Sequence, residues 1–404
     1  MTSAELRARA LRVMPGGVSS NIRAVEQDPP LVLARAAGAH VWDEEGRRYI
    51  DHVCGFGAVV LGYAPPGLVA AMGAALADGW QTGGVGRLEI EAAEALVAAV
   101  PAMESCRFHG SATEAIQTAL RIARAATGRR TVVKFARHYH GWVLPTDQQI
   151  AATAARNEVA DYLALPWNDA DAIARLMDAR GQEIAAVITE PMMANQGCFM
   201  PDPGWLELLQ ARSRAAGALF VLDETVTGFR LALGGLQETM GLSPDLSIFG
   251  KAFAGGAPIG AVGGRRALMD LLADGTVGHG GTFNGSAPSM AAALWSVAEL
   301  RRQGPAFFTG LAARGRALMD GLAQAAREAG IDVRLRGPGP IFWLAFDDAD
   351  PTDAETPRYR RFRQRMRAQG VRMGTGGRWY VSAAHGEAEI ADVVAAARLV
   401  FGEG

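Results

Sequence analysis

Short apolar runs alternate with longer segments of helical periodicity through the middle of the chain. Five runs are bounded by glycine, proline or polar residues and are predicted to be buried strands, at 105–108, 131–135, 184–188, 218–222 and 246–249. Helices are predicted between them at 113–126, 170–177 and 205–216. Continuous apolar strands that alternate with helices are typical of a mostly parallel sheet with both faces covered. Residues 55–290 are therefore expected to form a large α/β domain.

The two ends of the chain follow other patterns. Residues 1–54 combine a first amphipathic helix with a small sheet over 31–51, and we expect them to join the small domain and a subunit interface. Residues 291–404 are expected to form a small α+β domain. Its predicted elements are helices at 290–302, 307–329 and 387–400 and strands at 332–335, 341–346, 371–373 and 379–382. The stretch 347–357, rich in proline and aspartate, is expected to be an exposed loop.

Composition narrows the class of protein. Of 404 residues, 49% are hydrophobic and 20% are charged, which is typical of a globular chain. The formal net charge is -2, so the chain has no net positive charge that would attract a polyanion, and nucleic acid is not an expected partner. Apolar runs are far shorter than the ~20 residues of a membrane helix, so no membrane span is expected. Three scattered cysteines and an N-terminus without an apolar signal core predict a cytoplasmic protein with free thiols, with a transit peptide as the minor alternative.

Polar residues that follow the apolar runs are the first candidates for chemistry, because ligands bind at the carboxyl ends of parallel strands. Asp223 ends one run, and Lys251 follows another, 28 residues later. A lone aspartate more often caps a turn, and a lone lysine is more often solvated. Together, however, a lysine amine can condense with an aldehyde and a carboxylate can pair with a ring nitrogen. This pair predicts pyridoxal phosphate as the cofactor.

A phosphate group would need its own site. The segment Gly110–Glu114 opens a predicted helix and offers free backbone N–H groups with two hydroxyls, which is typical of an anion site. A plain capping box between Ser111 and Glu114 explains the same residues equally well. The glycine-rich stretch 280–285, which contains Thr282, is a second and weaker candidate.

An aromatic motif, Tyr139-His140-Gly141-Trp142, follows the strand predicted at 131–135. We expect Tyr139 to stack on a planar ring. For His140 and Trp142 we expect core packing. No metal site is expected, because the seven histidines lack acids or cysteines at ligand spacing.

Taken together, these motifs resemble the class III (subgroup II) pyridoxal-phosphate aminotransferases of fold type I, and most closely their glutamate-1-semialdehyde aminomutase branch. The resemblance covers nearly the whole chain. It rests on the segments 15–23, 41–51, 110–114, 139–141, 190–191, 223–224, 227–230, 244–246, 250–251 and 281–282.

The resemblance implies roles for the matched positions. Lys251 would be the Schiff-base lysine and Asp223 the partner of the pyridine nitrogen. The phosphate would be contacted by Ser111, Ala112 and Thr113, and the family usually has glycine at position 112. Tyr139 would stack on the ring, Glu190 would lie near the cofactor edge, and Ser20 and Arg23 would contact a substrate carboxylate. Thr282 would contact the phosphate of the neighbouring subunit, in a homodimer with shared active sites.

Three departures from the aminomutases stand out. The segment 143–161 is short where those enzymes carry a long gating loop. Gly377, followed by Arg378, stands where they have a glutamate. Phe56 stands where their Gly-Trp-Gly segment has its tryptophan. The parts specific to the mutase are therefore missing, while those needed for transamination remain.

These observations favour an aminotransferase that moves an amino group from an amino acid to a carbonyl acceptor. An aminomutase or racemase is the alternative within the same fold. A cofactor-binding protein without activity is a third interpretation, which the retained Lys251 and Asp223 argue against. Arg23 and Arg378 indicate a carboxylate on the substrate. Small keto acids, β-keto acids, aryl keto acids and amino-sugar precursors remain open as acceptors.

Overall fold

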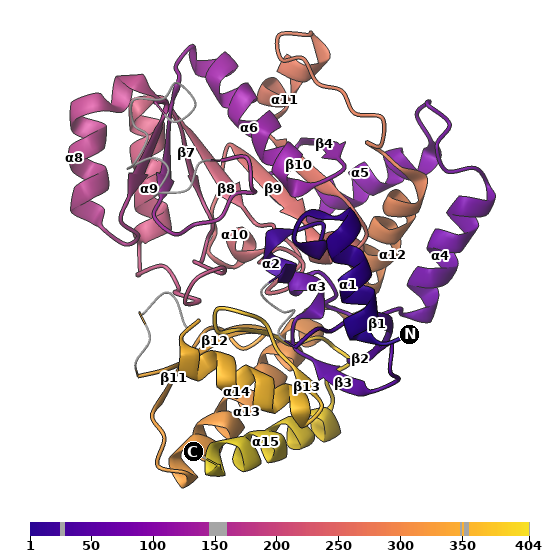
Figure 1. Cartoon of the computed structure of the whole chain (residues 1–404). Coiled ribbons are helices and arrows are strands. Elements are labelled where there is room, and N and C mark those ends of the chain that lie inside the picture. Colours follow the sequence, from indigo (N-terminus) through magenta and orange to yellow (C-terminus); the bar gives the residue numbers. More distant parts are fainter. Residues whose placement is uncertain (25–28, 145–159, 348–349, 351–354, 404) are drawn as a thin grey trace. The chain divides into compact units, whose positions relative to one another are not determined.

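The computed structural model describes the whole chain except residues 25–28, 145–159, 348–349, 351–354 and 404 (Figure 1). Contacts between residues divide the chain into two compact units. The first unit contains Met1–Pro65, Gln196–Cys198 and Thr309–Gly404, and the second contains Pro66–Asn195 and Phe199–Phe308. The division into domains at 54 and 290 stays a prediction.

A seven-stranded sheet forms the centre of the second unit, in the order β4-β10-β9-β8-β7-β5-β6. Only β10 is antiparallel to its neighbours, and the pairs from β9 to β6 are parallel. The predicted mostly parallel α/β sheet is therefore confirmed. The strands are β4 (Ser105–His109), β5 (Thr131–Phe135), β6 (Tyr162–Leu165), β7 (Ile184–Thr189), β8 (Leu219–Asp223), β9 (Leu246–Gly250) and β10 (Gly260–Gly264).

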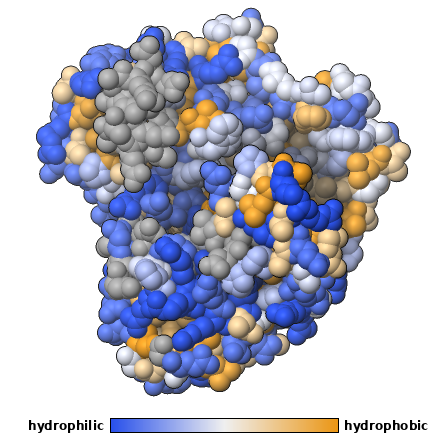
Figure 2. All heavy atoms as spheres, viewed as in Figure 1, coloured by the Kyte–Doolittle hydropathy of each residue, from blue (hydrophilic) through white to orange (hydrophobic). Residues whose placement is uncertain are grey.

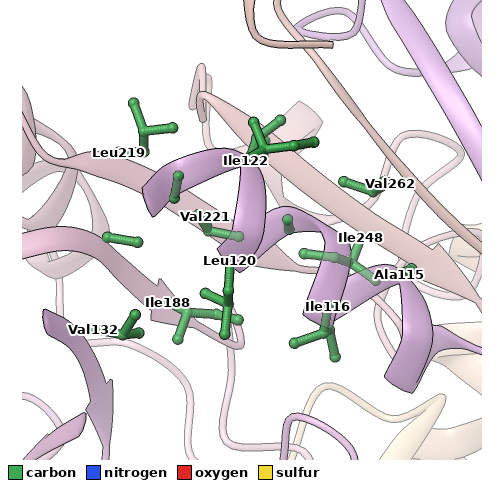
Figure 3. Close-up of a cluster of buried hydrophobic side chains, with 14 of the residues drawn as sticks. Ala115, Ile116, Leu120, Ile122, Val132, Ile188, Leu219, Val221, Ile248 and Val262 are labelled. Carbon is green, nitrogen blue, oxygen red and sulfur yellow. The ribbon is translucent and has the colours of Figure 1, made fainter. Parts of the chain in front are cut away.

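Alternate residues of each strand face different layers of helices. On β8, Leu219 and Val221 belong to the apolar cluster formed with α6 (Ala112–Thr127) and α11 (Arg266–Ala273), which Figure 3 shows. Phe220 and Leu222 belong to the opposite cluster, with α8 (Ala170–Arg180) and α9 (Trp205–Ala216). Because side chains alternate along a strand and both faces are covered, the strands are continuously apolar. The unit also contains α4 (Pro66–Ala77), α5 (Arg87–Ala99), α10 (Leu236–Thr239) and α12 (Ala287–Gln303).

The first unit contains two small sheets, in the orders β1-β2-β3-β13 and β11-β12-β14. Their strands are β1 (Leu33–Ala37), β2 (His40–Asp43), β3 (Arg48–Asp51), β11 (Val333–Arg336), β12 (Ile341–Phe346), β13 (Val371–Arg372) and β14 (Arg378–Tyr380). The helices are α1 (Ser3–Val13), α2 (Asn21–Ala24), α3 (Cys54–Gly57), α13 (Pro305–Glu328), α14 (Pro357–Ala368) and α15 (Glu387–Gly402). The first residues of α13, up to Phe308, are assigned to the second unit. Most of the loop predicted at 347–357 lies outside the described residues. Helix α14, which begins at its end, was not predicted.

The surface and the thiols agree with the composition. Hydrophilic residues predominate on the face drawn in Figure 2, and hydrophobic ones occur there in small separate groups. Within the described residues, no helix is both long and apolar enough to cross a membrane. Cys54, Cys106 and Cys198 are all free thiols.

Gly260 is the point where three chain segments meet. It pairs with His109 of β4 on one side and with Gly250 of β9 on the other. A Cβ atom at Gly260 would lie 2.2 Å from the carbonyl oxygen of Ser111 and 2.5 Å from the backbone nitrogen of Ala112. The start of α6 can therefore approach the sheet this closely only because position 260 has no side chain.

We predict that Gly260→Ala destabilises the protein by about 1–3 kcal/mol, because the new methyl group forces the backbone of Ser111 and Ala112 away. The measurement is the thermal midpoint of the protein without cofactor. Gly73→Ala in α4 is the matched control, since no atom lies within 4 Å of its added Cβ, and it should leave the midpoint unchanged or slightly higher. Equal midpoints for the two variants would contradict the packing argument.

Candidate active site

Three chemically active side chains lie at the carboxyl ends of adjacent strands. Glu190 follows β7, Asp223 ends β8 and Lys251 follows β9. These strands are parallel neighbours, so their carboxyl ends share one edge of the sheet. The charges of Asp223 and Lys251 both act on Glu190. The structure thus brings together Asp223 and Lys251, which the sequence placed at strand ends, and Glu190, for which the resemblance implied a position near the cofactor edge.

Asp223 is a buried carboxylate held by two neighbours. Its Oδ2 accepts a hydrogen bond from His140 Nδ1 at 2.8 Å, and its Oδ1 accepts one from the backbone nitrogen of Thr225 at 3.1 Å. Burial alone would raise the pKa of Asp223, but the hydrogen bond and charge of His140, together with the bonds from Thr225, bring the pKa below its usual value. Asp223 is therefore ionised at neutral pH, although only 3% of it is exposed.

His140 and Trp142 differ from the core packing that their sequence predicted. His140 is buried, but it is a polar partner of Asp223 and not merely a packing residue. Trp142 is 81% exposed, so the expectation of core packing is wrong for it. The motif leaves the sheet directly after β5, and its fourth residue already lies beyond the packed edge. The signal that could have identified His140 is its place just after a strand end, where polar residues meet.

Glu190 is 3% exposed and accepts three hydrogen bonds. Its Oε1 accepts from the backbone nitrogen of Tyr139 at 2.9 Å. Its Oε2 accepts from the backbone nitrogen of Ala194 at 3.3 Å and from Asn195 Nδ2 at 3.1 Å. Burial, and then the charge of Asp223, raise the pKa of Glu190 to about 8, although Tyr139 and Lys251 oppose the shift.

A second buried acid, Glu224, lies beside Asp223 in the chain. It accepts hydrogen bonds from the backbone nitrogen of Gln237 at 2.7 Å and from the hydroxyl of Thr227. Burial raises the pKa of Glu224 to about 7. Gln237 in turn accepts a bond from the hydroxyl of Ser247 at 3.1 Å. Glu224 therefore belongs to a polar network at this edge of the sheet.

Lys251 has an unusual backbone and no equivalent in the chain. Its φ of +46° lies in the left-handed region, which residues other than glycine rarely adopt, and such strain clusters at functional sites. The preceding Gly250 has extended backbone. The sequence contains one other lysine, Lys134, which is buried inside β5. Lys251 is therefore the lysine positioned at the carboxyl edge.

The proposed phosphate loop lies at the start of α6. Ser111 is the N-cap, and its hydroxyl oxygen accepts a hydrogen bond from the backbone nitrogen of Glu114 at 3.3 Å. The Ser111 hydroxyl also donates to Glu114 Oε2 at 3.1 Å, so Ser111 forms the N-cap half of the expected capping box. Phosphate contact by Ser111, Ala112 and Thr113 stays a prediction. Ala112 is the first helical residue and needs no special backbone conformation. The glycine usual in the family is therefore not required here.

The Tyr139 loop lies against this same helix start. A Cβ atom at Gly141, whose φ is +79°, would lie 2.5 Å from Thr113 Oγ1, so only glycine fits this close approach. The side chain of Tyr139 is 52% exposed, so protein packing covers only half of it. Its stacking on a ring stays a prediction.

The remaining candidates lie elsewhere in the chain. Thr282 is exposed, and its carbonyl oxygen accepts a hydrogen bond from Gln81 Nε2. Ser20 and Arg23 are exposed, and Arg23 lies in α2. Arg378 is the first residue of β14. All three residues belong to the first unit. Most of the shortened segment 143–161 lies outside the described residues. The described part of the chain contains no group of three or more side chains suited to a metal ion.

A comparison with protein families decides the class. The model of the class-III aminotransferases matches residues 22–385. The chain belongs to the class III aminotransferases. Glutamate-1-semialdehyde 2,1-aminomutase from Thermomicrobium roseum is 39% identical over 99% of this chain and 98% of its own length.

Solved structures agree with this family and with fold type I. A β-phenylalanine aminotransferase from Variovorax paradoxus is 32% identical, has a TM-score of 0.89 and covers 99% of this chain and 94% of its own. An ω-transaminase from Sphaerobacter thermophilus is 29% identical, with a TM-score of 0.89 over 100% and 98% of the two chains. The resemblance stated from the sequence is therefore confirmed, and this class III aminotransferase is an enzyme that uses pyridoxal phosphate and acts on small molecules.

The residues at the sheet edge fit that cofactor. Pyridoxal phosphate supplies an aldehyde that condenses with amines and a ring that accepts electron density. Lys251 would provide the amine, and as a base it would move a proton at the reacting carbon. Ionised Asp223 would keep the ring nitrogen protonated, and His140 holds Asp223 in place. The cradle at the start of α6, which a Cβ at Gly260 or Gly141 would fill, would hold the phosphate.

We predict that Glu224→Gln removes a pH dependence of stability. The pKa of Glu224 is raised in the folded protein. Its contribution to the free energy of unfolding is therefore fully present below its ordinary pKa of 4.5 and is lost as the pH rises through about 7. One pKa unit corresponds to about 1.4 kcal/mol, so the free energy of unfolding of the wild type should fall by on the order of 2–3 kcal/mol relative to that of Glu224→Gln between pH 5 and pH 8.5. Thermal midpoints of both proteins at both pH values measure this, and an unchanged difference would contradict it.

We predict that Lys251→Ala abolishes turnover, a loss of at least about 100- to 10,000-fold, because the cofactor loses its amine and the reaction its base. Borohydride treatment of the wild type with cofactor, followed by peptide mass spectrometry, should label Lys251, and no lysine in the variant. Lys134→Met is the control and should keep the label. A label on Lys134 in the wild type would show that the assignment is wrong.

Proposed function

We propose that this enzyme is an aminotransferase that moves an amino group from an amino acid donor to a carbonyl acceptor such as a keto acid. Bound pyridoxal phosphate would carry the amino group between two half-reactions, and Lys251 would act as the base in each. Arg23, Ser20 and Arg378 are proposed to contact a substrate carboxylate. This choice within the family rests on the turn that precedes β14.

The turn at Gly376 and Gly377 carries the proposal. Their φ values are +63° and +80°, in the region that favours glycine. Each carbonyl oxygen accepts a hydrogen bond from β12, that of Gly376 from Trp343 Nε1 at 3.0 Å and that of Gly377 from the Leu344 backbone nitrogen at 2.8 Å. A glutamate at 377, which the aminomutases are expected to carry, would be strained in this backbone. The turn therefore supports transamination and disfavours mutase chemistry.

The aminomutase alternative has its own support, because relatives at 37–39% identity carry that name. A mutase must keep its intermediate until the second amino transfer, so it turns over one substrate without any keto acid. The two activities can therefore be separated by the requirement for an acceptor.

We also propose a homodimer with shared active sites. Large apolar side chains are exposed around one hollow of the second unit, which Trp80, Val85 and Thr282 line. Trp80 is 47% exposed, Val85 78% and Phe283 63%. Exposed apolar groups of this kind are typical of an interface, and a second copy would place Thr282 at its partner's cofactor. The free thiols support a cytoplasmic location.

We predict ping-pong kinetics. Adding an amino donor alone should convert the bound cofactor to its amine form and release one equivalent of keto product, and adding a keto acid should reverse the visible spectrum. The measurement is the absorbance of the bound cofactor over a panel of donors and acceptors, with Lys251→Ala as the inactive control. Efficient conversion of glutamate-1-semialdehyde to its isomer without any acceptor would establish the mutase instead.

A further inference from the structure

Glu190 joins two loops that leave the carboxyl edge of the sheet. The first loop follows β5 and contains Tyr139, and the second follows β7 and contains Ala194 and Asn195. One carboxylate oxygen accepts from the backbone nitrogen of Tyr139 at 2.9 Å. The other accepts from Ala194 and Asn195. A single buried side chain thus links the Tyr139 loop to the loop that follows β7.

The link to the Tyr139 loop is reciprocal. While the carboxylate of Glu190 accepts from the backbone nitrogen of Tyr139, the backbone nitrogen of Glu190 donates to His138 Nδ1 at 3.1 Å. His138 is 4% exposed, and its own backbone nitrogen donates to the Phe135 carbonyl at 3.2 Å. Two consecutive residues of the loop are therefore fixed by one residue after β7, in the manner of a capping box.

Tyr139 needs such an anchor more than its neighbours do. His140, the next residue, is buried and bonded to Asp223. Tyr139 has half of its surface exposed, so the protein covers only half of it. Its backbone, from which the side chain extends, is held by the hydrogen bond to Glu190.

The donors around Glu190 indicate why a glutamate makes this link. The described contacts of its two oxygens are three N–H donors, Tyr139, Ala194 and Asn195. Three donors on two sides require an acceptor oxygen at each position, which the carboxyl group of a glutamate provides. A glutamine of the same shape would turn an NH₂ group toward at least one of these donors, and that hydrogen bond would be lost.

We propose that Glu190 is a positioning residue of the cofactor site, which acts on bound pyridoxal phosphate through Tyr139 and not by a contact of its own. The carboxylate holds the backbone of Tyr139 so that the ring lies over the cofactor plane. The inference concerns cofactor binding alone, so it does not depend on the choice between aminotransferase and aminomutase.

A double-mutant cycle of Glu190→Gln and Tyr139→Leu tests this proposal. The substitution Tyr139→Leu removes the ring but keeps the backbone N–H. The measurements are the dissociation constant of pyridoxal phosphate, by titration of the protein without cofactor, and the visible circular dichroism of the bound cofactor. Each single variant should weaken binding about tenfold, and the double variant no more than Tyr139→Leu alone. The dichroism of Glu190→Gln should approach that of Tyr139→Leu.

Glu224→Gln is the matched control, because Glu224 is also a buried acid at a strand end but bonds to Thr227 and Gln237. Any effect it has on affinity should add to that of Tyr139→Leu. Additive effects of Glu190→Gln and Tyr139→Leu, or unchanged affinity in Glu190→Gln, would overturn the proposal. If Glu190→Gln does not fold, Glu190→Asp takes its place in the cycle, since it keeps the carboxyl group but is one methylene too short to reach Tyr139.

Discussion

The hydrogen bond between His140 Nδ1 and Asp223 Oδ2 sets the charge on which the rest of the site depends. It is 2.8 Å long and almost completely shielded from solvent. Without it, burial would raise the pKa of Asp223, and a neutral acid could not keep a ring nitrogen protonated. The imidazole comes from the loop after β5 and the carboxylate from the end of β8, two strands away in the sheet. The charge of Asp223 therefore depends on strand order, which brings His140 to it, as well as on its sequence neighbour Thr225.

The same constraint explains why equally buried acids differ. Asp223 has an imidazole partner, and its pKa is lowered. Glu190 and Glu224 accept hydrogen bonds from neutral donors, and burial raises their pKa values to about 8 and about 7. Neutral N–H and O–H groups offset only part of the desolvation cost of a carboxylate, and the charge of Asp223 adds to it in both glutamates. One ionised carboxylate at the sheet edge thus makes a second and a third one more costly, and this division leaves Asp223 as the anion.

The sequence predicts the features of this structure that are determined by residues close together in the chain, and it does not predict contacts between distant segments. Apolar runs predicted the strands that carry Glu190, Asp223 and Lys251, because a strand buried on both faces has only apolar residues. β10, with the sequence Gly-Ala-Val-Gly-Gly, was missed because glycine is rare in strands, and here Gly260 is required by the close approach of Ser111. α14 was missed because its many arginines hide the buried Tyr359, Phe362 and Met366. The bond from His140 to Asp223 could not be predicted, since it depends on which strands are neighbours.

The turn at Gly377 shows why overall identity is a poor guide to the choice between two reactions on one cofactor. Transamination and amino-group migration both need a lysine base, a carboxylate for the ring and a phosphate site, so 39% identity to an aminomutase reflects in large part what the two reactions share. The position expected to separate them is here a glycine in left-handed backbone. A residue with a Cβ costs roughly 1–2 kcal/mol at a φ of +80°. Gly377→Glu would therefore add strain to a turn that Gly376 also shapes, so the change of one side chain at this position is not energetically neutral.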